Sequence, residues 1–544
     1  MENDTSNSNY ESMQTIKTTE TDTLKTLNTE KKEEEKIQEE NLEKTVLKEN
    51  KSEKKKEQVE IIINDETIGL EFPYLDEMIN KRGMTCLQWK SLSICSMIYF
   101  LEGMHVSLSG LLFVPILQSF KLNTFIGCLV SSSLVFCMAF GALIAGSFSQ
   151  LKGRNITIIF FLLIISVSST FAIIQHPLIL LITRSINGFS LGVIIPIITN
   201  HLIEVLPKKF RSFWVISLTF FFSLGAILST QIIITCNKRF ELFYFCISIP
   251  STIIMIIFVL CYEDNPRYLI LNHKYEDGIK IIEKYYKNNV KIEENEKQEI
   301  IRNVDKGINK EVKLIGKYSF IFKRYKKITM ILSFVWSLYS FMVNGGIFNL
   351  FMGNAMSSSY IYSDDFDDDL LDSFWAFEIL YLIFGFSCLI AGLITEIKIC
   401  GRKKTILSGF LLSFIFQIIF LIFKFETNGI FFFYIFSLFF INISFNAINT
   451  YSMEIYPTRV RDTAMGFLSF ISRICGFFSN FVTIILFNFW TTWLLYFSII
   501  ITFIGIIFSC LLPFDTYNRE LDIKLPEKKK PIERPNEEII MTIK

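Results

Sequence analysis

Long runs of apolar residues, separated by short polar connections, occupy the chain from about Ser91 onward. Each run approaches the roughly 20 residues with which an α-helix crosses the hydrocarbon core of a bilayer. The pattern predicts twelve such helices, at approximately 91–118, 124–148, 156–175, 177–204, 212–234, 241–261, 328–352, 373–397, 404–423, 429–453, 463–487 and 490–513. A charged segment of about 65 residues separates the sixth run from the seventh. We therefore expect an all-α membrane protein built as six transmembrane helices, a linker and six more.

Two short motifs recur in the same order in both halves of this pattern. The octapeptides EVLPKKFR (204–211) and EIYPTRVR (454–461) both read E-x-x-P-x-x-x-R and follow long apolar runs. A Gly-Arg pair begins at Gly153 in the first half and at Gly401 in the second. The first Gly precedes its Glu by 51 residues and the second by 53. The spacing predicts a duplicated six-helix unit, with both copies in the same orientation across the membrane.

The recurring charges are candidates for a cytoplasmic gate, because opposite charges at helix ends can join them in one state and release them in another. The candidates are Arg154, Glu204 and Arg211 in the first half and Arg402, Glu454 and Arg461 in the second. We expect Glu204 to lie near Arg154 or Arg211. In the same way we expect Glu454 to lie near Arg402 or Arg461.

Charge placement predicts the orientation and excludes one class of partner. Hydrophobic residues make up 51% of the chain, Phe numbers 56 and the net charge is only +1, so nucleic acid is not an expected partner. With a cytoplasmic N-terminus, the short inner loops hold eleven Lys and Arg and the outer loops hold four. This bias follows the positive-inside rule and places both termini and the linker in the cytoplasm. The eleven cysteines mostly lie in or beside the apolar runs, so no disulfide framework is expected.

Five parts follow from these patterns. They are a charged cytoplasmic N-terminal tail that we expect to be disordered (1–85), a first six-helix bundle (86–261), a cytoplasmic linker with amphipathic helices (262–327), a second six-helix bundle (328–513) and a cytoplasmic C-terminal tail (514–544). A Glu/Lys tract in the N-terminal tail leaves a partner-binding helix as an alternative to disorder.

Charged side chains inside the apolar runs are the first candidates for binding a solute or an ion, because charge in a bilayer core is costly and usually faces a cavity or a partner. Glu102 lies about 16 Å into the first helix at 1.5 Å per residue, near the midplane, with His105 three residues further on. Arg184 enters the fourth helix from the outside, and Arg473 enters the eleventh from the inside. Glu378 is a shallower outer candidate on the eighth helix.

Two interpretations of these charges stay open at this point. In the first, Glu102 and His105 bind a cation or a proton, and Arg473 meets an anionic group of the solute. In the second, Glu102 or Glu378 neutralises one of the buried arginines in a fixed pair, and His105 is a hydrogen-bonded structural residue. For Arg184, helix packing or gating is favoured over solute contact.

Aromatic and amide side chains extend the set of candidates. Trp336 and Tyr339 lie three residues apart on the seventh helix and could present aromatic faces to an organic ligand or a cation, with core packing as the alternative. Asn344, Asn446 and Asn449 add polar groups to the seventh and tenth helices.

The motifs resemble those of the major facilitator superfamily over about residues 85–522. They are GSFSQLKGR (146–154), similar to the loop signature G-x-x-x-D-x-x-G-R; RSINGFSLG (184–192), similar to R-x-x-x-G-x-x-x-G of the fourth helix; EDNPRYL (263–269), similar to E-S-P-R-[WY]-L; and LPFDTYNREL (512–521), similar to the P-E-T element after the last helix. The resemblance implies the major facilitator fold, whose halves are related by an axis along the membrane normal. Gln150 replaces the acid of the loop signature, so we expect the first half of the inner gate to be looser.

Two further stretches point to a branch of that superfamily. EIYPTRVRDTAMG (454–466) and SRICGF (472–477) resemble organic cation and anion transporters and relatives of synaptic vesicle glycoprotein 2. LEGMH (101–105) is similar to the D-G-x-E of the vesicle-protein relatives. The resemblance implies a secondary transporter that moves an organic ion, a vitamin or an aromatic acid by alternating access, with a proton or cation as the candidate coupling ion.

Two alternatives share this fold. One is a sugar or polyol carrier, although 217–225 and 337–346 lack the Gln-rich signatures of sugar porters. The other is a non-transporting membrane sensor or vesicle protein. An enzyme is not expected, because the four His residues are scattered and no Walker loop is present. We expect no cofactor and no metal, a monomer, and a place in the plasma membrane or in a vesicle or organelle membrane.

Overall fold

The computed structural model describes residues 79–80, 83–111, 113–174, 176–236, 240–271, 274–285, 314–343, 368–423, 427–456, 458–489 and 491–517. The chain divides into two units, Met1–Ile68 and Gly69–Lys544, and all described residues belong to the second. The expectation of a disordered tail therefore falls almost wholly outside the described residues, as does Asn344.

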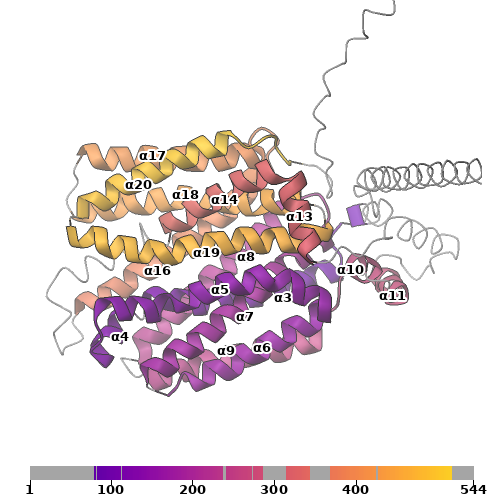
Figure 1. Cartoon of the computed structure of the whole chain (residues 1–544), viewed down its shortest axis with the longest axis horizontal. Coiled ribbons are helices and arrows are strands. Elements are labelled where there is room, and N and C mark those ends of the chain that lie inside the picture. Colours follow the sequence, from indigo (N-terminus) through magenta and orange to yellow (C-terminus); the bar gives the residue numbers. More distant parts are fainter. Residues whose placement is uncertain are drawn as a thin grey trace, which may run out of the picture. The chain divides into compact units, whose positions relative to one another are not determined.

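Helices make up the described part of the chain (Figure 1). Those of the first half are α3 (Cys86–Leu111), α4 (Phe113–Phe120), α5 (Thr124–Lys152), α6 (Arg154–Phe171), α7 (Pro177–Val205), α8 (Arg211–Cys236) and α9 (Phe240–Cys261). The linker contributes α10 (Pro266–Leu271), α11 (Tyr275–Tyr285) and α13 (Leu314–Arg324). The second half contains α14 (Lys326–Phe341), α16 (Asp368–Thr395), α17 (Gly401–Phe423), α18 (Thr427–Ile455), α19 (Thr458–Phe489) and α20 (Thr491–Cys510).

Nine helices in the described residues are long and apolar enough to cross a membrane, by length and composition. They are α3, α5, α6, α7, α8, α9, α16, α17 and α19. The remaining expected runs coincide with α14, α18 and α20, so each of the twelve runs corresponds to a helix. This agrees with the prediction of an all-α integral membrane protein. For α14, α18 and α20, the membrane crossing itself stays a prediction.

The glycine of each Gly-Arg pair makes a sharp connection possible. Gly153 between α5 and α6 has φ +88°, and Gly401 at the start of α17 has φ +61°. Both values lie in the left-handed region, which glycine adopts without the steric cost of a Cβ. At Gly401 the carboxylate of Asp515 also occupies the space that a Cβ would need. The backbone conformation alone therefore explains why glycine recurs at both positions, whatever the neighbouring arginine does.

Close backbone contact between α5 and α7 explains the spaced glycines of the fourth run. A Cβ at Gly188 would meet the carbonyl of Leu134, and one at Gly192 would meet the carbonyl of Met138. Between the halves, α5 packs along α19 and α8 packs along α16. In each of these two pairs the helices lie side by side along much of their length, and together they form the main contact between the halves (Figure 1).

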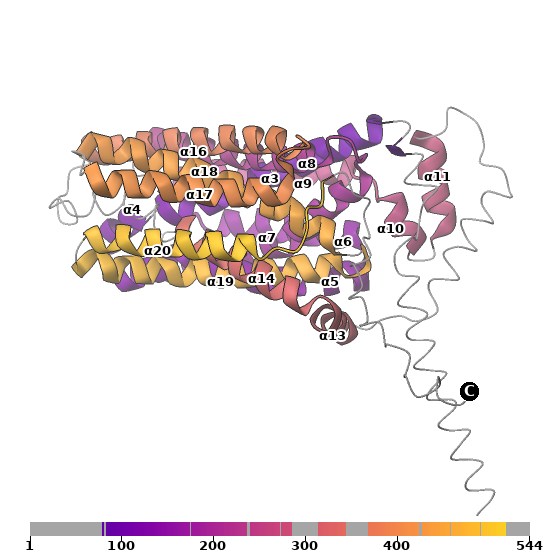
Figure 2. The ribbon, with the colours of Figure 1, turned by 90° about the horizontal axis from the view of Figure 1, so that it is seen from above.

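The linker helices lie at one end of the helix axes (Figure 2). Asn265, just before α10, donates a hydrogen bond from Nδ2 to Glu204 Oε2 at 2.7 Å. Tyr318 on α13 donates to the carbonyl of Leu143 on α5 at 2.9 Å, and its ring lies edge-on to Phe467 on α19. We call this end, which carries the repeated motifs, the motif end.

Candidate functional site

An ion pair joins the two halves in the middle of the membrane-spanning helices. Arg473 Nη2 on α19 lies 3.3 Å from Glu102 Oε1 on α3. The side chains are 18% and 9% exposed, so the pair is sheltered but can still be reached. Two charges in such surroundings stabilise each other, and removing one leaves the other poorly compensated. The fixed-pair interpretation of Glu102 and Arg473 therefore describes this conformation.

Aromatic rings of the second half form a group on α14 and α18, and α14 packs against α19, the helix that carries Arg473. Tyr339 on α14 stacks on Phe445 of α18 with ring centroids 3.9 Å apart and an interplanar angle of 9°. Trp336, one turn earlier, meets the same Phe445 edge-on at 5.4 Å. Ser472, next to Arg473, donates to the carbonyl of Trp336 at 3.3 Å. The predicted aromatic residues thus form one group, linked to the residue before Arg473 through the backbone of Trp336, with Phe445 as an addition that the sequence did not single out.

Amide side chains of α18 connect this aromatic group to the first half. The Tyr339 hydroxyl donates to Asn442 Oδ1 at 3.5 Å. Thr219 on α8 donates to Asn446 Oδ1 at 2.9 Å, which is a hydrogen bond between the halves. Asn449 is partly buried. Asn442, which the sequence did not single out as a site residue, bonds to Tyr339 and also to Asn446 and Ser387.

The other predicted membrane charges do not join this group. Arg184 Nη2 donates to Ser109 Oγ on α3 at 2.8 Å and to the Ser131 carbonyl on α5 at 3.1 Å. His105 Nε2 lies 3.4 Å from Ser251 Oγ on α9. Neither side chain shares a hydrogen bond with Glu102. The last of these candidates, Glu378, accepts a hydrogen bond from Gln231 on α8.

The first charged cluster lies at the motif end and contains Arg154, Glu204, Arg461 and Asp462. Arg154 donates to both oxygens of Glu204, at 2.8 and 3.2 Å. Arg461 Nη1 on α19 lies 3.4 Å from Glu204 Oε1, and Asp462 Oδ2 lies 3.5 Å from Arg154 Nη2. The expected pairing of Glu204 with Arg154 is present. Arg461, however, pairs with Glu204 of the opposite half rather than with Glu454.

The second charged cluster contains Arg402, Glu454, Glu396 and Arg211. Arg402 Nη2 lies 3.2 Å from Glu454 Oε1 and 3.4 Å from Glu396 Oε1. It also donates a short hydrogen bond to Ser212 Oγ on α8, across the halves. Burial raises the pKa of Glu396, although Arg402 opposes this shift. Arg211 is 5% exposed and forms no ion pair with a described carboxylate.

The expected loosening of the first half of the inner gate is not what the structure shows. Gln150 brings no charge to the loop, but Asp462 of the opposite half supplies the second carboxylate beside Arg154. Asp462 also accepts a hydrogen bond from Asn200 Nδ2 at 2.7 Å. The sequence held a signal for it, since the second octapeptide continues with Asp where the first continues with Ser212.

In each cluster, the central arginine lies over a tyrosine ring from the segment that follows the last long helix of one half. The Arg154 guanidinium lies 4.4 Å from the Tyr268 ring centroid, and that of Arg402 lies 5.2 Å from Tyr517. Asp515 accepts from the backbone N–H of Arg402 at 3.1 Å and thereby holds the start of α17. Both covering segments come from the stretches that resemble superfamily motifs.

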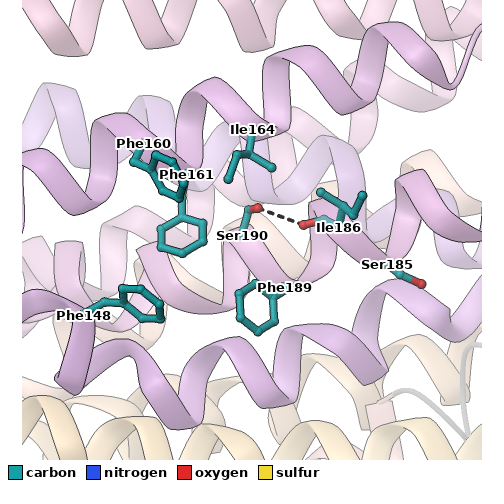
Figure 3. A pocket seen from close by; sticks show the side chains of 8 residues that line it. All are labelled: Phe148, Phe160, Phe161, Ile164, Ser185, Ile186, Phe189 and Ser190. Atoms are coloured by element: carbon teal, nitrogen blue, oxygen red, sulfur yellow. Dashed lines mark hydrogen bonds between the residues drawn. The ribbon is translucent and has the colours of Figure 1, made fainter.

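A cavity of about 410 Å³ lies apart from these sites, between α5, α6 and α7 (Figure 3). Its lining is Phe148, Phe160, Phe161, Ile164, Ser185, Ile186, Phe189 and Ser190. Both serines donate to backbone carbonyls of their own helix, at 2.7 and 2.8 Å. Phe160 is 55% exposed, so the cavity opens to the outside of the helix bundle. No candidate charge lines it, which makes it unsuited to a polar solute.

Comparison with known proteins adds three findings. A family model described as "Sugar (and other) transporter" matches residues 42–524. The 4-hydroxybenzoate transporter PcaK of Pseudomonas aeruginosa is 28% identical over 151 residues, and this match spans 27% of the chain and only 33% of that protein's length. The synaptic vesicle 2-related protein of Xenopus laevis is 21% identical over 480 residues, 82% of each chain.

The fold also has solved counterparts. A structure of the major facilitator superfamily proton:xylose symporter XylE, bound to 6-bromo-6-deoxy-D-glucose, superposes with a TM-score of 0.66. The match covers 80% of this chain and 98% of the symporter at 15% identity. At that identity the likeness shows the fold alone.

Proposed function

This chain belongs to the sugar (and other) transporter family, and on that premise we propose that it carries a small organic acid across a membrane by alternating access. Its nine apolar helices in the described residues and its major facilitator fold fit an integral multi-pass membrane protein. We place the solute between the halves, beside Arg473, and the gate at the motif end. We assign the motif end to the cytoplasm because of the positive-inside bias.

The ion pair between Glu102 and Arg473 supports this proposal most directly. It is partly accessible and it joins the two halves, and Arg473 follows Ser472, which bonds to the backbone of Trp336 in the aromatic group around Phe445. A solute carboxylate can replace Glu102 as the partner of Arg473, because a guanidinium binds carboxylates through paired hydrogen bonds. An aromatic ring on the solute would then pack against Trp336 or Tyr339. An aromatic acid, the solute class in the name of one relative, has both features.

This exchange also suggests a coupling step. When a solute carboxylate takes Arg473, Glu102 loses its counter-ion inside the membrane, and an unpaired buried carboxylate is strongly unfavourable. Uptake of one proton by Glu102 removes the negative charge. Solute anion and proton then bind together, and their release on the other side restores the ion pair.

Closure at the motif end supports the gating part of the proposal. In this conformation the halves are joined there by the pairs of Glu204 with Arg461 and of Arg154 with Asp462. The solute would leave toward the cytoplasm only after these contacts separate. The conformation described is therefore the one closed at the proposed cytoplasmic side.

A sugar or polyol is the second candidate solute, and the family match is the observation that favours it. Hydroxyl groups of such a solute could bond to Asn442 and Asn446 without displacing Glu102. This predicts transport that does not depend on Arg473. A non-transporting role, as in a sensor or vesicle protein, predicts ligand binding without flux.

Counterflow in proteoliposomes that contain the full chain separates these possibilities. Vesicles are loaded with unlabelled 4-hydroxybenzoate, an organic cation, xylose or myo-inositol, and uptake of the matching labelled solute is measured. We expect aromatic-acid counterflow that falls at least about tenfold in Arg473→Ala, since a charged hydrogen-bonding partner is lost. Glu102→Gln should retain counterflow and lose uptake driven by a pH gradient.

Glu378→Gln is the matched control, because it neutralises a carboxylate that is bonded to Gln231 and not to Arg473, and it should behave as the wild type. Sugar counterflow that survives Arg473→Ala would overturn the organic-acid proposal in favour of the second candidate. Binding without counterflow for every solute would support the non-transporting role instead.

A further inference from the structure

Arg184 is a buried cation inside the first half with no carboxylate bonded to it among the described side chains. It lies on α7 and is 3% exposed. Its Nη2 donates to the Ser109 hydroxyl and to the Ser131 carbonyl, which are both uncharged. Its Nε has no hydrogen-bond partner. Burying an isolated charge is costly, and proteins normally supply a counter-ion.

The first half offers few carboxylates that could fill this role. Residues 86–261 contain three, Glu102, Glu204 and Glu241. Glu102 is bound to Arg473, and it precedes Ser109 by seven residues on α3, which is about 10 Å along the helix axis. Glu204 is bound to Arg154 at the motif end. Glu241, whose side chain lies outside the described ones, is the remaining acid.

The groups described around Arg184 are uncharged. The Tyr244 hydroxyl of α9 is buried next to the guanidinium, toward which its oxygen acts as an acceptor, and its O–H has no described acceptor of its own. His105, one turn before Ser109 on α3, is also buried and lies near Arg184. Two polar hydrogens, the N–H of Arg184 Nε and the O–H of Tyr244, therefore lack a described acceptor beside a full positive charge.

We propose that a small anion binds beside Arg184 and Tyr244, within the first half and separate from Arg473. The N–H of Arg184 Nε and the O–H of Tyr244 would donate to it, and its charge would neutralise the guanidinium. Two sources supply this chemistry, namely inorganic chloride and the carboxylate of an organic acid. The chloride case is independent of the proposed solute. The carboxylate case rests on the proposed function and would add a second subsite to it.

Thermal unfolding of the purified full chain in detergent tests the site without transport. The midpoint is measured in sodium gluconate, whose anion is too large for a buried site, while chloride replaces gluconate at constant ionic strength. A ligand that binds only the folded state raises the midpoint, and we expect a saturable rise of about 2–6 °C. Arg184→Gln should abolish the rise and, in gluconate, should unfold no earlier than the wild type. Tyr244→Phe keeps the packing and should shift the titration to several-fold higher chloride.

A second arm replaces chloride with benzoate and identifies the source of the anion. Benzoate stabilisation that is lost in Arg184→Gln and kept in Arg473→Gln assigns the site to an organic carboxylate. Benzoate stabilisation that is lost only in Arg473→Gln, beside a chloride effect that needs Arg184, assigns the site to chloride and leaves the proposed solute site intact.

Glu241→Gln is the control that can overturn the proposal. If Glu241 is the counter-ion of Arg184, the wild type will ignore both anions and Glu241→Gln will gain a response to them. An anion response that persists in Arg184→Gln would contradict the site as well. So would the lack of any response in both the wild type and Glu241→Gln.

Discussion

The two charged clusters at the motif end each hold two arginines and two carboxylates, but they take one carboxylate from different places. Arg154 of the first cluster has Glu204 and Asp462 beside it, and Asp462 comes from the start of α19. Arg402 of the second has Glu454 and Glu396, and Glu396 comes from the connection that follows α16. The duplication has therefore kept the charge balance without keeping the positions.

The two additional carboxylates do not occupy equivalent positions. Where the second half has Asp462, the first has Ser212; Glu396 precedes its Gly-Arg pair by five residues, whereas Gln150 precedes its own by three. Because Asp462 belongs to the opposite half from Arg154, the first cluster gains an ion pair between the halves. Glu396 and Arg402 belong to the same half, so among the described residues the second cluster crosses the halves through the hydrogen bonds of Ser212 and through Arg211 near Glu454, without an ion pair at contact distance. The first cluster should therefore hold the closed state more strongly.

Removing the central arginine of each cluster tests this difference most strongly. Arg154→Ala leaves Glu204 and Asp462 without their main counter-ion, and we expect a loss of about 3–5 kcal/mol in unfolding free energy. Arg402→Ala should cost less, because Arg211 lies close to Glu454, has no ion pair of its own with a described carboxylate, and can take over. Denaturant unfolding in detergent measures both. Equal losses would show that the clusters are equivalent despite their different connections.

Moving the acid within the first cluster separates charge balance from contact between the halves. Asp462→Ser should cost about 1–3 kcal/mol and expose the motif end, because one pair between the halves is lost. Adding Gln150→Asp restores the carboxylate on the same half as Arg154, so stability should recover while the exposure remains. Labelling of an engineered cysteine at the motif end reports the exposure. Recovery of both properties would mean that only the net charge of the cluster matters.

The smallest expected effect concerns pH and the second cluster. Burial raises the pKa of Glu396 above the ordinary 4.5, so the folded protein holds this proton more tightly than the unfolded chain. Stability then falls as pH rises from about 4.5 through the raised pKa. Over this pH window, the unfolding free energy of the wild type should thus fall by a few tenths of a kcal/mol relative to that of Glu396→Gln. The change is small because Glu396 is partly exposed to solvent. Unfolding midpoints of both proteins at several pH values test this. A wild type that gains stability relative to Glu396→Gln as pH rises would contradict the prediction.

Several features of the fold followed from local patterns. Apolar runs of membrane length predicted the helices because each run must satisfy its backbone hydrogen bonds within itself. The repeated glycines predicted equivalent turns, and both have the positive φ that favours glycine. Within each half, the repeated motifs left Arg154 or Arg211 as the neighbour of Glu204 and Arg402 or Arg461 as the neighbour of Glu454. The structure has Arg154 with Glu204 and Arg402 with Glu454.

The sequence by itself thus determined the helices, the duplication and the family resemblance, and it offered two arginines as partners for each of Glu204 and Glu454, because these depend on short-range periodicity and on a repeated spacing. Only the tertiary structure decided that Glu102 pairs with Arg473, 371 positions away, and that Arg461 and Asp462 complete the cluster of the opposite half. It also left Arg184 bonded to uncharged oxygen atoms of Ser109 and Ser131 rather than to Glu102. The physical reason is that contacts between the halves depend on how two separately folded surfaces dock, and that geometry is not encoded in the spacing of residues along either half.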